Sequence, residues 1–197
     1  MTLIIVRHCQ SEWNKLNKFT GLQDIDLSEN GKIKALECGK LLMDYQIDIA
    51  YTSELKRTYH TCELIKKGST QNFEIIKNGY INERDYGNLT GLNKDETKKT
   101  YGEEQVQLWR RSVDIRPPGG ENLLEVIDRV RVFYENIIKK HLNNNDNILI
   151  VGHGNSIRSL MVVMGLVDIK NIPKFETIVG IPMVIDLENK NYFNLWT

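Results

Sequence analysis

The sequence has 197 residues, and its 26 lysines and arginines balance 26 aspartates and glutamates, so its formal net charge is zero. This balance argues against nucleic acid or a membrane surface as the main partner, and an anion site must be a local cluster of cations. The apolar runs are too short to cross a bilayer, and no signal peptide precedes the first predicted strand. We therefore expect one cytoplasmic domain spanning residues 1–197.

The three cysteines, Cys9, Cys38 and Cys62, are odd in number and show no CxxC spacing. A disulfide framework needs an even set, and a structural zinc site usually shows paired, closely spaced ligands. The cysteines therefore indicate neither feature. They are typical of a protein from a reducing compartment.

The first part of the chain predicts strands that alternate with helices. Residues 3–6 form a continuous apolar run of strand length, as expected for a strand buried on both faces. A polar loop over residues 15–23 precedes a helix that runs to about Tyr45, with Ser28 or Asp26 as its cap.

The rest of the chain continues the same alternation. Thr52 or Ser53 can cap the second helix, and Trp109 is the one large anchor of the polar helical segment 93–114, where we expect it to pack in the core. The further expected elements are, in order, strand 47–51, helix 54–67, strand 73–77, helix 93–114, helix 121–141, strand 148–151, helix 156–164, and strands 183–187 and 192–196. This order predicts an α/β fold, a three-layer α/β/α sandwich with a mostly parallel central sheet.

Two of the four histidines follow the two most clearly buried strands. His8 comes after the run 3–6, next to Arg7, and His153 comes after the run 148–151. Open α/β sheets bind their ligands at the carboxyl ends of their strands. If the two strands are neighbours, His8 and His153 face each other at that edge.

Three kinds of site fit this pair poorly. A zinc site needs three or four ligands, and no closely spaced histidine pair supplies them. The stretch 152–156 has His where a serine hydrolase elbow, G-x-S-x-G, needs no histidine, and a cysteine phosphatase loop would need Arg where Lys15 stands. The remaining hypothesis is a histidine nucleophile acting on phosphate, with Arg7 and Arg57 gripping the phosphate oxygens bidentately.

The motifs also resemble a known family. Arg7-His8, the stretch 11–14 and the stretch 152–156 resemble the histidine phosphatase superfamily. Within it, the chain is similar to the phosphoglycerate mutases that depend on 2,3-bisphosphoglycerate. The stretches that carry the closer match are 19–21, 82–87, 91–94 and 101–112.

The resemblance implies an isomerase that interconverts 3-phosphoglycerate and 2-phosphoglycerate in glycolysis and gluconeogenesis, with 2,3-bisphosphoglycerate as primer and no metal. His8 would carry the phosphoryl group and Glu83 would be the proton donor and acceptor. The other implied catalytic residues are Arg7, Arg57 and His153. The implied substrate-binding residues are Asn14, Thr20, Gly21, Arg84, Tyr86, Lys94, Arg110, Arg111, Gly154 and Asn155.

Three positions depart from the family pattern. Cys9 stands where Gly is usual, Gln10 where Glu is usual, and Asp85 where His is usual. A side chain at position 9 would crowd the loop if the backbone there needed positive φ. We expect Asp85 to point away from Glu83 or to pair with a cation such as Arg84.

Two rivals to the mutase stay open. The compact connection at 115–121 resembles the phosphatase branch, and the sequence ends at Thr197 without the basic tail that covers the site in many mutases. We therefore expect some hydrolysis of the phosphoenzyme, and a simple phosphomonoesterase is the nearest rival. A weak phosphate-binding protein is the second. A homodimer or homotetramer is possible, and the sequence does not choose between them.

Overall fold

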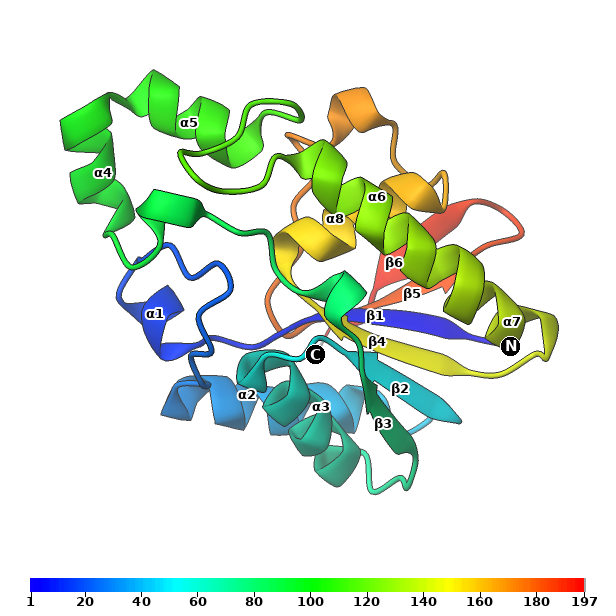
Figure 1. Ribbon diagram of the computed structural model, residues 1–197. Coiled ribbons are helices and arrows are strands. Elements are labelled where there is room, and N and C mark those ends of the chain that lie inside the picture. The colour runs from blue at the N-terminus through cyan, green and yellow to red at the C-terminus, as the bar shows by residue number, and fades with distance from the viewer. Residues whose placement is uncertain (197) are drawn as a thin grey trace.

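The computed structural model describes residues 1–196 and contains a six-stranded sheet in the order β3-β2-β4-β1-β5-β6 (Figure 1). The strands are β1 (Leu3–Arg7), β2 (Ile49–Thr52), β3 (Glu74–Lys77), β4 (Ile148–Gly152), β5 (Pro182–Asp186) and β6 (Asn191–Asn194). Strands β3, β2, β4 and β1 are parallel, while β5 pairs antiparallel with β1, and β6 with β5. The mostly parallel sheet is as predicted.

Helices cover both faces of this sheet, which confirms the three layers. The helices are α1 (Glu12–Lys15), α2 (Glu29–Leu41), α3 (Lys56–Gly68), α4 (Lys94–Tyr101), α5 (Glu103–Arg111), α6 (Leu123–Phe133), α7 (Lys139–Asn143) and α8 (Gly154–Val163), with short turns η1 (Gly79–Ile81), η2 (Gly87–Leu89), η3 (Tyr134–Ile138) and η4 (Ile169–Asn171). Within residues 1–196, no helix is both long and apolar enough to cross a membrane.

The alternation of β1 side chains divides the core between the two faces. Leu3 and Ile5 join a cluster with α6 and α8, whereas Ile4 and Val6 join a cluster with α2 and α3. Figure 1 shows these two helix layers on opposite sides of the sheet. Because successive strand residues point to opposite faces, a strand buried on both sides must be apolar throughout.

The structure corrects several local predictions. The segment 93–114 is two helices, because Gly102 has φ of 83° and interrupts the run. The segment 121–141 is not one continuous α-helix, because the π-helical segment η3 lies between α6 and α7. The short helix α1 was not predicted, and the α2 helix ends at Leu41, before Tyr45.

The caps and Trp109 were predicted with mixed success. Ser28 caps α2 by accepting a hydrogen bond from the Gly31 amide. The expectation that Thr52 or Ser53 caps α3 was wrong, since that helix begins after Leu55 and has no side-chain cap. Trp109 packs against a small cluster near Phe19, as expected. That residues 1–197 form one domain stays a prediction, and Thr197 lies outside the described residues.

Candidate active site

The two histidines meet at the carboxyl edge of the sheet. Strands β1 and β4 are parallel neighbours, and Arg7 pairs in register with Gly152. The His8 amide donates to the Gly152 carbonyl oxygen at 3.0 Å, and the ring centroids of His8 and His153 lie 5.0 Å apart. The expectation that the two imidazoles face each other is confirmed.

His8 is held as a neutral imidazole with one free nitrogen. Its Nδ1 lies 2.7 Å from the Cys9 carbonyl oxygen, which only accepts hydrogen bonds, so the ring proton belongs on Nδ1. Burial, and then the charges of Arg57 and Arg7, hold the pKa of His8 well below its ordinary value. The Nε2 lone pair is therefore available for attack at neutral pH.

His153 is held by a residue for which we had predicted a different role. Its Nε2 lies 2.8 Å from the hydroxyl oxygen of Ser53, at the end of β2. Ser53 also accepts a hydrogen bond from the Leu55 amide, so the expected capping serine orients an active-site histidine. Burial, followed by the charge of Arg57, lowers the pKa of His153 well below its ordinary value.

Arg57 enters from the first turn of α3, and only 1% of its surface is exposed. Its guanidinium donates to the carbonyl oxygens of Gln23 at 2.7 Å and Gly21 at 2.8 Å, which fixes it against the loop that follows α1. Arg7 is tied to the Thr177 carbonyl at 3.1 Å. Both guanidinium groups are thus oriented in advance, which lowers the entropy cost of holding an anion.

Glu83 reaches the pocket from the irregular segment between η1 and η2. Its Oε1 accepts from the Arg84 amide at 2.8 Å and from the Asn155 amide at 3.3 Å, in the first turn of α8. The Asn155 side chain in turn donates to the Tyr86 hydroxyl at 3.2 Å. The segment that carries Glu83 and the first turn of α8 therefore hold this carboxyl group together.

These side chains surround a cavity of about 170 Å³. Seven basic side chains and only two carboxylates line its wall, although the whole chain is formally neutral. Three buried polar atoms on the wall, Arg7 Nε, Thr20 Oγ1 and Arg111 Nη1, have no hydrogen-bond partner among the described residues. Buried polar groups are normally paired, so these atoms mark a place built for a polar anion.

Most of the predicted site residues line this cavity. They are Arg7, His8, Asn14, Thr20, Gly21, Arg57, Glu83, Tyr86, Lys94, Arg110, Arg111, Gly154 and Asn155. His153 lies directly behind His8 instead of on the wall. Burial, together with the nearby Arg110 and Arg7 charges, lowers the pKa of Lys94.

Arg84 is not placed as predicted. It is fully buried, and its Nη2 donates to the Trp109 carbonyl oxygen at 2.7 Å, while the group stacks 4.7 Å from the Tyr86 ring centre. It does not line the cavity, so the assignment of a substrate contact to Arg84 is withdrawn. Its position anchors α5 and supports Tyr86 from behind.

Three residues of the cavity wall were not predicted from the sequence: Lys18, Arg158 and Glu176. Lys18 directly precedes the 19–21 motif, and Arg158 lies one helical turn after Gly154, so their positions carried a usable signal. Glu176 carried none. It makes ion pairs with Arg111 and with Arg158, at 2.5 and 2.9 Å, across elements remote in sequence.

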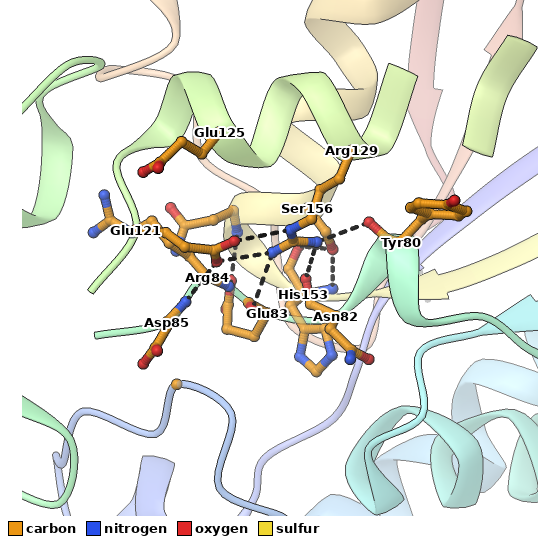
Figure 2. A network of polar contacts seen from close by, with 12 residues as sticks. Tyr80, Asn82, Glu83, Arg84, Asp85, Glu121, Glu125, Arg129, His153 and Ser156 are labelled. Carbon is orange, nitrogen blue, oxygen red and sulfur yellow. Dashed lines mark hydrogen bonds and ion pairs between the residues drawn. The ribbon is translucent and has the colours of Figure 1, made fainter. Parts of the chain in front are cut away.

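The three departures from the family pattern are accommodated without loss of the site. Cys9 is buried with ordinary backbone geometry, and its amide donates to Thr61 Oγ1 at 3.1 Å. The Gln10 side chain accepts from Ser28 Oγ at 2.9 Å. Asp85 accepts from the Gly87 amide at 2.8 Å and points away from Glu83, as Figure 2 shows; it does not pair with Arg84.

Comparison with known proteins decides the family. The family model of the histidine phosphatase superfamily (branch 1) matches residues 3–190. The chain belongs to this superfamily. It is 46% identical over 189 residues to the 2,3-bisphosphoglycerate-dependent phosphoglycerate mutase of Rhizobium meliloti, covering 94% of this chain and 90% of the relative. It is 44% identical to the phosphoglycerate mutase of Schizosaccharomyces pombe, with the same coverage.

Solved structures agree on the histidine phosphatase fold. A mycobacterial glucosyl-3-phosphoglycerate phosphatase superimposes with a TM-score of 0.84 at 20% identity, covering 99% of this chain and 98% of that one. Bacillus stearothermophilus YhfR gives a TM-score of 0.81 at 22% identity, covering 98% and 94%. At such low identities these structures establish the fold alone.

Proposed function

We propose that this chain is a phosphoglycerate mutase that interconverts 3-phosphoglycerate and 2-phosphoglycerate through a phosphohistidine on His8. The carrying observation is a neutral, pre-oriented imidazole in a cavity with more cations than one phosphate needs. Lys94, Arg110 and Arg111 lie on the wall in addition to Arg7 and Arg57. A plain phosphomonoesterase has no use for this second group. The named relatives support the same assignment.

His8 and Glu83 share the chemistry in this proposal. His8 Nε2 attacks phosphorus, forming a P–N bond as the P–O bond to the leaving oxygen breaks. The Glu83 carboxyl gives that oxygen its proton. In the reverse direction Glu83 takes the proton of the attacking hydroxyl, and the phosphoryl group returns from His8 to oxygen. Arg7 and Arg57 stabilise the charge on the equatorial oxygens throughout.

The cavity suits 2,3-bisphosphoglycerate as the primer. When bound, this molecule would supply the phosphoryl group that charges His8. Its two phosphates and one carboxylate match a wall with seven basic side chains and three unpaired buried polar atoms. Arg7, Arg57 and Asn155 would hold the phosphate at His8, and Lys94, Arg110 and Arg111 would hold the other anionic groups. This mechanism requires no metal.

Hydrolysis of phosphohistidine is the second candidate activity. The connection that contains Pro117–Gly120 is compact and is bonded directly to the Glu83 segment, with the Asn88 amide donating to the Pro118 carbonyl at 2.8 Å. In this proposal, water that reaches the phosphohistidine competes with the substrate hydroxyl. We propose hydrolysis as a side reaction of the mutase. The proposal also includes small-molecule substrates and a cytoplasmic location for the enzyme. That the protein forms a dimer or tetramer stays a prediction.

An enolase-coupled assay on 3-phosphoglycerate tests the proposal. It would be run with and without 2,3-bisphosphoglycerate, with released phosphate followed in parallel and His8→Ala as the control. We expect product formation that the bisphosphate stimulates, little free phosphate, and no turnover by His8→Ala. Free phosphate without 2-phosphoglycerate would show a phosphatase instead. Full turnover by His8→Ala would remove the nucleophile assignment.

A further inference from the structure

The segment that carries Glu83 has no strand partner to hold it. It runs from η1 to η2 along the edge of the cavity, and its backbone is not part of the sheet. A proton donor must stay within hydrogen-bond reach of the reacting oxygen, and a misplacement of about 1 Å costs on the order of 100-fold in rate. Other groups must therefore fix this backbone.

The guanidinium group of Arg129 holds the part of the segment that leads up to Glu83. Arg129 extends from α6, and its Nη1 donates to the carbonyl oxygens of Tyr80 at 2.7 Å and Asn82 at 2.9 Å. Its Nη2 donates to the carbonyl oxygen of Glu83 itself at 3.2 Å. Figure 2 shows these contacts fanning from a single side chain, and the side chain is 19% exposed.

The carboxylate of Glu121 holds the part of the segment that follows Glu83. Glu121 accepts hydrogen bonds from Arg129 Nε and Nη2, both at 3.2 Å, and from the Asp85 amide at 2.9 Å. The Glu121 amide also donates to the Asp85 carbonyl at 3.0 Å. Residues before and after Glu83 are thus tied to one ion pair, which is largely shielded from water.

We propose that Arg129 and Glu121 form a clamp that positions Glu83 for proton transfer. This inference rests on the proposed function and adds two positioning residues that do not line the cavity. Arginine suits the role because its planar group has five N–H donors in a fixed fork, whereas lysine presents a single point charge. The clamp also places the Glu83 carboxyl beside the Arg84 and Asn155 amides that it accepts from.

Leaving-group dependence separates positioning from mere stability. An alkoxide such as that of 3-phosphoglycerate needs a proton from Glu83, whereas 2,4-dinitrophenolate leaves without one. For Arg129→Met we expect kcat for mutase turnover to fall 10- to 100-fold with KM within threefold of wild type. With 2,4-dinitrophenyl phosphate, the rate constant of the burst that phosphorylates His8 should fall less than threefold. Arg129→Lys should lie between Arg129→Met and wild type.

A double-mutant cycle with Glu83→Gln completes the test. If Arg129 acts through Glu83, the kcat loss from Arg129→Met should largely disappear in the Glu83→Gln background. The matched control is Arg116→Met, which breaks an exposed ion pair between the loop before α6 and Glu125 of α6 and should leave kcat unchanged. Equal losses with both esters, or an undiminished loss in the Glu83→Gln background, would overturn the clamp.

Two further measurements guard against ambiguity. Glu121→Gln keeps an acceptor for the Asp85 amide but loses the ion pair, so it should reproduce the ester dependence even if Arg129→Met folds poorly. If the wild type did not isomerise 3-phosphoglycerate, the proposed function would fail, and glycerol phosphate would replace it as the alkyl ester. If both Arg129→Met and Glu121→Gln then hydrolysed glycerol phosphate at the wild-type rate, the clamp would be overturned as well.

Discussion

At the scale of single residues, the chemistry depends on how each group is held. His8 is useful because a carbonyl oxygen fixes its proton on Nδ1 and burial keeps it neutral. Its motif was readable from sequence, since it follows directly after a buried strand. Ser53 and Glu176 were not readable, because their partners His153, Arg111 and Arg158 lie far away along the chain.

Glu176 predicts a test of charge within the cavity. Its carboxylate pairs with Arg111 and Arg158 and offsets their attraction for substrate anions. Glu176→Gln removes that competing charge, and a unit charge at about 4 Å in a water-like medium is worth about 1 kcal/mol. We expect KM for 3-phosphoglycerate to fall about fivefold, measured by the coupled assay at low salt.

The matched control for this prediction is Glu188→Gln, which makes the same change in net charge at an exposed position outside the cavity. Its KM should equal that of the wild type. Higher ionic strength should shrink the effect at position 176, because salt screens exposed charges. An identical KM for the two variants would show that Glu176 does not oppose substrate binding.

At the scale of elements, apolar periodicity located the strands and most helices. It failed where local backbone geometry decides, as at Gly102, which divides one predicted helix into α4 and α5. It also could not show how closely two helices approach. Helices α2 and α3 touch at Gly39 and Gly68, where a β-carbon on Gly39 would lie 2.4 Å from the Ile65 carbonyl oxygen.

This close approach predicts that Gly39→Ala destabilises the protein. The added carbon meets backbone, so the two helices must move apart, and overpacking of this kind costs about 1–3 kcal/mol. Urea unfolding measures the loss. Lys40→Ala, at the exposed neighbouring position on α2, is the control and should remain near wild type. Equal unfolding midpoints for the two variants would contradict the argument.

At the scale of the whole molecule, the buried histidines couple stability to pH. The pKa values of His8 and His153 are lowered, first by burial, so the unfolded chain binds protons more readily than the folded chain below about pH 6.5. Their contribution to stability is complete above that pH. It declines as the pH falls, until the folded pKa values are reached.

We therefore expect the free energy of unfolding to fall between pH 7 and pH 5.5, with each histidine contributing up to about 1.4 kcal/mol per pH unit. Urea unfolding of the wild type and of His8→Asn at both pH values measures this. The variant should lose less stability over the interval, because one of the two groups is missing. Equal losses in the two proteins would rule out a linked protonation of His8.

The layered α/β architecture and the meeting of His8 with His153 could be predicted from local patterns in the sequence, because a buried strand dictates its own composition and the carboxyl ends of parallel neighbours share one edge. Most of the cavity wall was implied by the resemblance to the mutases and not by any local pattern. The buried position of Arg84, the ion pairs of Glu176 and the contacts of Arg129 and Glu121 around Glu83 depend on the folded arrangement of distant elements. Side chains with several rotamers find their partners across the fold, and spacing along the chain does not encode that choice.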